Sequence, residues 1–543
     1  MGNILQLFVY CCDRKKIRRN LIRSKSLTQD LLEEYRSDDL SVHMEHVANL
    51  KELKIKPSTF IRENTELPAD VYQMIEFINQ GSYGLVVKVK PFYINEERAM
   101  KIIKKSDKLN GMKENDIHNE IKILKSLDHP NIIKIHEFFS DLINFYIITE
   151  YCQEGDLQTK LTRVNYLSED VVMNIMVQIL STISYLHAKG ILHGDLKLDN
   201  ILIDSSRYAC KEKVENYSCE SNNSTFYKKY PNNSDQFFDI KLIDFGCSKI
   251  FRKDVKQSTF VGTPYYIAPE VFRNEYDEKS DLWSCGIIMF ILLTGRMPFE
   301  GSDVEEINKL QSSKVLNDSR GISKNASDLI KRLLKYDPEK RPSAKKSLQH
   351  PWFKSFSTED TYIMDFTYSK SVLNNLRNFH AQQKFQQAVV TYITHNLVKK
   401  AEVHNLRNIY KMLDKDNDGR LSKSELKDAF REILGTVLAD IDIDNIFRSI
   451  DHDNNGYIEY EEFLRATLDR NLLLSESNLR HAFDIFDIDK NGSISVEETK
   501  NIIGGGKNIP DNIITDLFAE IDKGTDEEIT FEEFKEIMIR LVK

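Results

Sequence analysis

Residues 414–425 read DKDNDGRLSKSE, and this stretch decides the fold of the last quarter of a 543-residue chain. It supplies carboxylates at positions 1, 3, 5 and 12 of a loop and a glycine at position 6. Short oxygen-bearing side chains at alternate positions and one longer glutamate can wrap a hard divalent cation, while the glycine permits a sharp turn. The stretch therefore predicts a cation-binding loop between two helices.

The same frame recurs at 451–462 and at 487–498. One acidic turn between surface helices can arise by chance, but three in tandem with one spacing cannot, and the donor set suits Ca²⁺. An apolar residue at position 8 of each loop can pair neighbouring loops back to back. The sequence thus predicts a calmodulin-like EF-hand domain over 401–543. The calcium-ligand candidates are Asp414, Asp416, Asp418, Arg420 and Glu425, then Asp451, Asp453, Asn455, Tyr457 and Glu462, then Asp487, Asp489, Asn491, Ser493 and Glu498.

A fourth loop, 522–533, departs from the frame. Asp522, Asp526 and Glu533 keep ligand types in place. However, Gly524 replaces a ligand at position 3 and Glu527 replaces the turn glycine. Two alternatives stay open for this loop: Ca²⁺ binding, or a purely structural role as the partner of the third loop.

Charge is distributed unevenly along the chain. Residues 401–543 hold 18 Lys+Arg and 32 Asp+Glu, a net −14, whereas the remainder is net +5. Residues 1–25 hold seven basic residues and one aspartate, a composition that suits an anionic membrane surface or partner. With 41% hydrophobic and 29% charged residues, collagen-like and wholly disordered classes are excluded. The seven scattered cysteines predict a reducing intracellular compartment without a disulfide framework.

A second set of motifs lies in residues 71–353, where strand-like runs give way to helical periodicity. The glycine-rich stretch 78–86 is followed by Lys101, within Ala99-Met100-Lys101, and then by Glu120, which opens a helical stretch. Further along come HGDLKLDN at 193–200, DFG at 244–246 and APE at 268–270. A lone glycine loop would be weak evidence, but the ordered set resembles the protein kinase family.

The resemblance implies a role for each motif residue in phosphoryl transfer from ATP. Asp195 would accept the substrate hydroxyl proton, and Lys197 would steady the transferred phosphate. Asp281, Trp283 and Arg341 match the scaffold of the large lobe. The residues implied to bind ATP are Ile78, Asn79, Gly81, Gly84, Val86, Lys101, Glu120, Thr149, Glu150 and Cys152, and those implied to hold Mg²⁺ are Asn200 and Asp244.

The order of the two parts resembles the calcium-dependent protein kinases of plants and apicomplexan parasites. This implies a two-lobed α+β kinase fold followed by an all-α EF-hand domain of two pairs. Between them, residues 354–400 resemble the junction that in this family occupies or blocks the substrate groove at low Ca²⁺, and a plain helical linker is the alternative. Residues 205–238 interrupt two strand-like segments and are expected to form a mobile surface insert.

The expected function is that of a calcium-activated serine/threonine kinase. Lys197 and the sequence Gly262-Thr263-Pro264 resemble the serine/threonine branch. Gly194 stands where most kinases have an arginine, and Asn79 replaces the first loop glycine. These departures keep open an alternative, a calcium-sensing scaffold with a weak or inactive kinase domain. Expected partners are protein substrates and Ca²⁺ but no nucleic acid, and a monomer is expected.

The arm 1–70 offers lipidation candidates. Gly2 is placed for myristoylation, although Gln6 stands where Ser or Thr is preferred, and Cys11 and Cys12 are candidates for palmitoylation. Because stable anchoring takes two signals, we expect a cytoplasmic protein that is partly membrane-associated. A disordered basic arm is the alternative.

Overall fold

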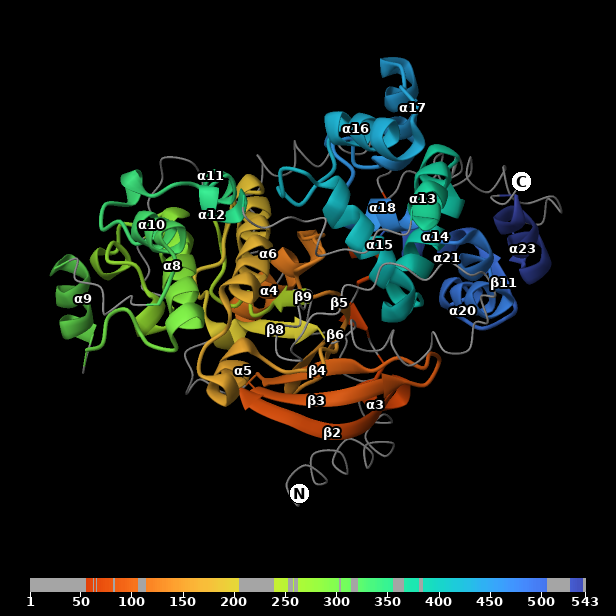
Figure 1. Ribbon diagram of the computed structural model, residues 1–543. Coiled ribbons are helices and arrows are strands. Elements are labelled where there is room, and N and C mark those ends of the chain that lie inside the picture. Colours follow the sequence, from red (N-terminus) through yellow and green to blue (C-terminus); the bar gives the residue numbers. More distant parts are fainter. Residues whose placement is uncertain are drawn as a thin grey trace, which may run out of the picture.

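The structure is a computed structural model in which three parts lie side by side (Figure 1). A strand-rich small lobe and a helical large lobe adjoin a second helical part, called here the EF-hand module (residues 366–540). The model describes residues 55–61, 63–64, 66–81, 84–105, 114–204, 239–251, 257, 262–301, 304–313, 321–354, 366–379, 384–504 and 528–540. The lipidation candidates Gly2, Cys11 and Cys12, the insert 205–238, and Asp522 and Asp526 lie outside these residues.

The small lobe is built on a six-stranded sheet of order β1-β5-β6-β4-β3-β2, in which only β1 and β5 are parallel. Alternating apolar residues of the strands form one buried face, because successive side chains point to opposite sides of a sheet. Helix α4 (Glu114–Ser126) carries Glu120 to the sheet. The strands are β1 (Glu63–Asn64), β2 (Tyr72–Gly81), β3 (Gly84–Pro91), β4 (Arg98–Lys104), β5 (Ile135–Ser140) and β6 (Asn144–Glu150), and α3 (Pro68–Val71) precedes β2.

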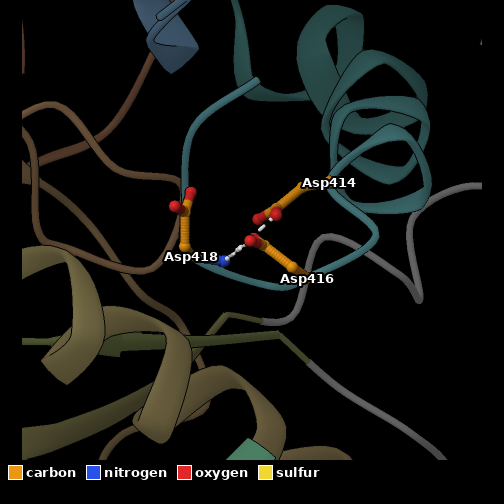
Figure 2. A group of neighbouring side chains, drawn as sticks. All are labelled: Asp414, Asp416 and Asp418. Atoms are coloured by element: carbon orange, nitrogen blue, oxygen red, sulfur yellow. Dashed lines mark hydrogen bonds between the residues drawn. The ribbon is translucent and has the colours of Figure 1, made fainter. Parts of the chain in front are cut away.

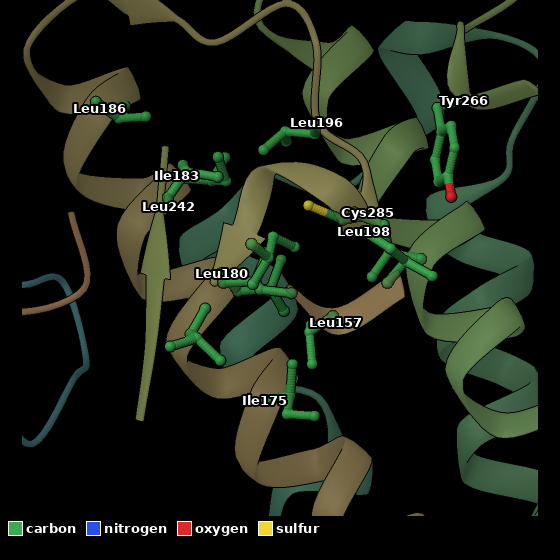
Figure 3. Close-up of a cluster of buried hydrophobic side chains, with 14 of the residues drawn as sticks. Leu157, Ile175, Leu180, Ile183, Leu186, Leu196, Leu198, Leu242, Tyr266 and Cys285 are labelled. Carbon is green, nitrogen blue, oxygen red and sulfur yellow. The ribbon is translucent and has the colours of Figure 1, made fainter. Parts of the chain in front are cut away.

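The large lobe surrounds two helices that are buried on nearly all sides, α6 (Glu169–Ala188) and α8 (Lys279–Thr294). Figure 3 shows part of their core, where Leu157, Ile175, Leu180 and Cys285 meet. Among the described residues α6 alone has the length and hydropathy of a membrane span, but 78% of its most apolar window is buried, as in the core helix of a globular protein. The remaining elements are α5 (Leu157–Val164), β7 (Ile191–Leu192), β8 (Ile201–Asp204), β9 (Asp239–Leu242), β10 (Lys249–Ile250), α9 (Val304–Ser313), α10 (Lys324–Leu333), α11 (Ala344–Leu348) and α12 (Pro351–Lys354).

The EF-hand module contains two pairs of helix–loop–helix units, as the sequence predicted. Leu421 and Ile458 at position 8 of the first two loops form a β-bridge. Ile494 and Ile529 pair in the same way between β11 (Ser493–Ser495) and β12 (Glu528–Thr530). The predicted back-to-back pairing is confirmed. The helices are α15 (Lys400–Leu413), α16 (Lys423–Leu434), α17 (Asp440–Ile450), α18 (Tyr460–Thr467), α19 (Arg470–Leu473), α20 (Glu476–Phe486), α21 (Val496–Gly504) and α23 (Phe531–Ile539).

The junction segment forms two helices, α13 (Phe366–Arg377) and α14 (Lys384–Asn396), that belong to the core of the EF-hand module. The Phe385 ring lies 5.5 Å from Phe486 and 5.8 Å from Phe534. Gln386 Nε2 donates a hydrogen bond to the carbonyl of Ile537 at 2.8 Å. Because the aromatic contacts are buried and the hydrogen bond joins the same elements, the junction helices and the second EF-hand pair form one packed unit in this arrangement.

Candidate active site and calcium-binding loops

Asp195 is nearly fully buried at the centre of the loop after β7. Its Oδ2 accepts a hydrogen bond from Lys197 Nζ at 2.7 Å, and its Oδ1 accepts one from the Thr263 hydroxyl at 2.8 Å. Lys197 Nζ also donates to Thr263 Oγ1 at 2.9 Å. Asn200 Nδ2 donates to the Asp195 carbonyl at 2.8 Å. These contacts fix the orientation of one carboxylate, which a general base requires.

Asp281, at the start of α8, fixes the backbone of this loop by accepting hydrogen bonds from its N–H groups. Its carboxylate accepts the N–H groups of His193 and Gly194, both at 3.0 Å, and the His187 ring at 2.9 Å. Burial raises the pKa of Asp281, but the hydrogen bond from His187 and nearby charge more than offset this and hold it below its ordinary value. Asp281 therefore positions the loop without facing the reacting atoms.

A second scaffold contact joins the activation segment to the large lobe. The Arg341 guanidinium makes a two-pronged ion pair with the Glu270 carboxylate at 2.5 and 2.7 Å, and both side chains are fully buried. Such a fork fixes direction as well as distance. Arg341 therefore holds the end of the segment that carries Thr263.

Lys101 lies between two carboxylates. Its Nζ is 3.1 Å from Glu120 Oε1 and 3.5 Å from Asp244 Oδ1. Burial lowers the pKa of Lys101, but the two carboxylates more than offset this and hold it above its ordinary value. Asp244 has a left-handed backbone with φ of 64°, uncommon away from glycine, and its buried Oδ1 accepts no hydrogen bond from the described residues. A buried carboxylate oxygen of this kind fits a Mg²⁺ site. Asn200 lies close to it in space, because its carbonyl accepts the N–H of Ile243, the residue before Asp244, at 2.9 Å.

The predicted nucleotide-loop residues lie at the ends of β2 and β3. Val86 is the register partner of Lys101, so the strand after the loop passes directly beside the lysine. Asn79, in β2, accepts the N–H of Gln80 through its own side chain at 2.7 Å. A Cβ at Gly84 would lie 2.1 Å from the Ile102 carbonyl oxygen, so this position requires glycine.

Thr149 and Glu150 end β6, and Cys152 lies in the hinge that follows. The buried Glu150 carboxylate lies 2.7 Å from Lys241 Nζ and 3.3 Å from Lys400 Nζ. Burial raises the pKa of Glu150, but these ammonium groups more than offset this and hold it below its ordinary value. The Glu150 side chain is thus engaged in ion pairs, and its backbone N–H donates to the Lys134 carbonyl at 3.0 Å. Burial also raises the pKa of the Cys152 thiol, to about 12.

The first calcium loop brings its acidic side chains together, and Figure 2 shows the carboxylates of Asp414, Asp416 and Asp418. Carboxylate oxygens of the three lie within 4.8 Å of one another. The N–H of Gly419 donates to Asp414 Oδ2 at 2.9 Å, and Asn417 and Gly419 both have positive φ. Burial and then neighbouring negative charges raise the pKa of Asp414 well above its ordinary value. Crowded carboxylates of this kind fit a divalent cation, which relieves their repulsion.

In the second and third loops the converging carboxylates come from positions 1, 3 and 12, whereas in the first loop they come from positions 1, 3 and 5. Asp451, Asp453 and Glu462 converge within 4.8 Å, as do the loop-3 residues Asp487, Asp489 and Glu498. At position 7, the Arg420 guanidinium of the first loop lies 4.0 Å from the Tyr457 ring of the second. The remaining predicted ligands also lie in these loops, with Glu425 Oε2 accepting the N–H of Ser422 at 2.9 Å, Asn455 Oδ1 accepting that of Tyr457 at 2.8 Å, and Asn491 Oδ1 accepting that of Ser493 at 2.8 Å.

The fourth loop is described only from residue 528 onward. There, Glu533 Oε2 accepts the N–H of Thr530 at 2.9 Å and its hydroxyl at 2.7 Å. Glu498 makes the same contacts with Ser495, at 2.9 and 2.8 Å. Glu533, the third residue of α23, therefore makes the same contacts as Glu498, the third residue of α21.

Sequence reasoning missed the contacts between the calcium loops and the catalytic lobes. Glu461, next to the candidate calcium ligand Glu462, accepts from Lys134 Nζ at 2.5 Å, and its N–H donates to Asp128 at 2.8 Å. No local pattern marks such partners, because they lie hundreds of residues apart. Two further ion pairs join Lys189 to Glu459 at 2.9 Å and Lys345 to Asp416 at 2.7 Å.

Comparisons with known proteins match both parts of the chain. The family model described as the protein kinase domain matches residues 72–353, and that of the EF-hand domain pair matches 404–468 and 476–539. The chain is 34% identical over 502 residues to calcium-dependent protein kinase 4 of Plasmodium berghei, covering 90% of each chain. It is 33% identical over 486 residues to calcium-dependent protein kinase 5 of Plasmodium falciparum, covering 88% of this chain and 79% of the relative.

Proposed function

Because the chain belongs to the calcium-dependent protein kinase family, we propose that it transfers the γ-phosphate of ATP to serine and threonine residues of proteins when Ca²⁺ rises. The observation that carries this proposal is the complete catalytic set. Asp195 is held by Lys197 and Thr263, and Lys101 is paired with Glu120. A scaffold with a degenerate kinase domain would have no need to keep these contacts.

Each residue of the set has a physical task. Asp195 Oδ atoms accept the proton of the attacking hydroxyl, and Lys197 places positive charge beside the transferred phosphate. Lys101 holds the nucleotide phosphates, while Asn200 and Asp244 would hold Mg²⁺. When bound, Mg²⁺ neutralises charge that develops on the phosphate oxygens. Lys197 also holds Thr263, so the substrate-side segment and the catalytic loop are linked by the same ammonium group.

We also propose that Ca²⁺ controls access to this site through the junction. The support is that α13 and α14 are packed into the EF-hand module, with Phe385 between rings of α20 and α23. Calcium opens sensor EF-hands by changing the angle between their helices, so segments packed against them move as well. At low Ca²⁺ the junction then occupies the substrate groove, and at high Ca²⁺ it is withdrawn.

The test is kinase activity against free Ca²⁺ at saturating ATP, for the full chain and for a chain that ends at Phe353. The full chain should be activated by Ca²⁺, and the shortened chain should be active at every Ca²⁺ concentration. Equal, calcium-independent activity in both would contradict junction control. Activity no higher than that of Asp195→Asn would instead favour the scaffold.

The N-terminal arm is proposed to bring this activity to the cytosolic face of a membrane. The support is the basic composition of residues 1–25 together with Gly2, Cys11 and Cys12 as acylation candidates. Gly2→Ala should shift the protein from membrane to cytosol, and replacing both cysteines by serine should add to the effect. Unchanged membrane fractionation of all variants would leave the arm as a spacer.

A further inference from the structure

Helix α15 presents a row of basic side chains to the catalytic lobes. This basic face consists of Lys400, Arg407 and Lys411, which are spaced by seven and four residues and so share one side of a helix. Lys400 Nζ donates a hydrogen bond to the backbone carbonyl of Tyr151 in the hinge. The same ammonium lies 3.3 Å from the Glu150 carboxylate. The EF-hand module therefore contacts the nucleotide hinge directly.

The rest of the basic face pairs with buried carboxylates of the large lobe. Arg407 is 2.8 Å from Asp204 and 3.7 Å from Asp239, and Lys411 is 2.8 Å from Asp239. Arg407, Asp204 and Asp239 are each at most 2% exposed. Breaking a buried ion pair leaves an uncompensated charge, which is costly, so docking of α15 is specific to this position.

The preceding helix, α14, contacts the small lobe. Arg98 of β4 donates to the carbonyl of Asn396 at 2.9 Å, and the His395 ring donates to the carbonyl of Ile135 in β5 at 2.9 Å. Helices α14 and α15 therefore bridge the small lobe, the hinge and the large lobe (Figure 1). These contacts fix the position of the small lobe relative to the large lobe, and the nucleotide site lies between the two lobes.

Helix α15 also leads directly into the first calcium loop, since Asp414 caps its C-terminal end. Calcium changes the angle between the helices that flank an EF-hand loop. One helix thus has a hinge contact at one end and a calcium ligand at the other. A change in this angle can therefore alter the contact of Lys400 with the hinge.

We propose that calcium binding and nucleotide binding are thermodynamically coupled through the contact of Lys400 with the hinge. This rests on the proposed function in one respect, that the EF-hand module rearranges with Ca²⁺. In the calcium-bound state, docking of α14 and α15 holds the two lobes and the hinge ready for ATP, so less ordering remains for the nucleotide to impose. Lys400 is a positioning residue, because it acts through the Tyr151 carbonyl. By linkage, ATP must tighten Ca²⁺ binding by the same factor.

The experiment measures binding on the full-length chain, without turnover. A non-hydrolysable ATP analogue with Mg²⁺ is titrated with saturating Ca²⁺ and with a calcium chelator, and Ca²⁺ is titrated with and without the analogue. Calcium should tighten analogue binding by roughly fivefold or more, and the analogue should tighten calcium binding equally. A factor of one would overturn the proposal without any variant, and agreement of the two factors checks that both titrations were made at equilibrium.

Variants of neighbouring lysines assign the coupling to one contact. Lys400→Gln should bring both factors close to one, and Lys400→Arg should restore them. Lys399→Gln is the matched control, because Lys399 is adjacent but exposed, and it should keep the wild-type factors. Undiminished coupling in a folded Lys400→Gln protein would overturn the assignment. Calcium-stimulated kinase activity without any coupling would refute this inference and leave the proposed function standing.

Discussion

The Thr263 hydroxyl is predicted to contribute to catalysis through the two charged groups that it touches. It donates to Asp195 Oδ1 at 2.8 Å and accepts from Lys197 Nζ at 2.9 Å. Thr263→Val keeps the shape of the side chain and removes both hydrogen bonds. Hydrogen bonds to charged groups contribute about 1.5–3 kcal/mol each. If the loss of one such bond is felt fully in the transition state, kcat should fall roughly 10- to 150-fold.

The assay is kcat on a basic Ser/Thr peptide at saturating Ca²⁺ and ATP, after phosphatase treatment of every protein. Thr263→Ser is the control, because it retains the hydroxyl and should keep most of the activity. Thermal unfolding of both variants checks that the fold is intact, since Arg341 and Glu270 hold the segment independently. If Thr263→Val matched Thr263→Ser in kcat, the hydroxyl would have no role in positioning Asp195.

Two other predictions concern the calcium loops and the activation segment. Glu498→Gln should raise the Ca²⁺ concentration for half-maximal activity more than Glu533→Gln does, because the third loop is complete whereas the fourth lacks two template residues. If a calcium titration gave the reverse order, the fourth loop would be the more important calcium site and this prediction would be wrong. The double variant Ser258→Ala/Thr259→Ala should retain most calcium-stimulated activity after phosphatase treatment, because a glycine beside the catalytic aspartate leaves no arginine for an activation-loop phosphate to neutralise. Asp195→Asn should abolish activity, and a collapse of the alanine variant to that level would refute this reasoning.

The local chemistry of both sites was readable from the sequence. A calcium loop takes all its ligands from twelve consecutive residues, so spacing alone predicts it, and Asp414, Asp416 and Asp418 do converge. The catalytic motifs are likewise short, since Asp195, Lys197 and Asn200 come from the eight consecutive residues 193–200. Residue type does not predict every feature of these loops. The backbone of Lys490, at position 4 of the third loop, is left-handed with φ of 60°, a conformation that lysine rarely adopts.

How the parts meet was decided only by the tertiary structure. The spacing of Lys400, Arg407 and Lys411 indicates a basic helix face, but nothing local shows that its partners are Asp204 and Asp239. The junction likewise reads as helical in sequence, whereas its burial against α20 and α23 depends on distant aromatic residues. The physical reason is the range of the interactions. Ligand spacing and helical periodicity depend on neighbouring residues, whereas desolvated ion pairs and apolar packing between parts exist only once the chain has brought those surfaces together.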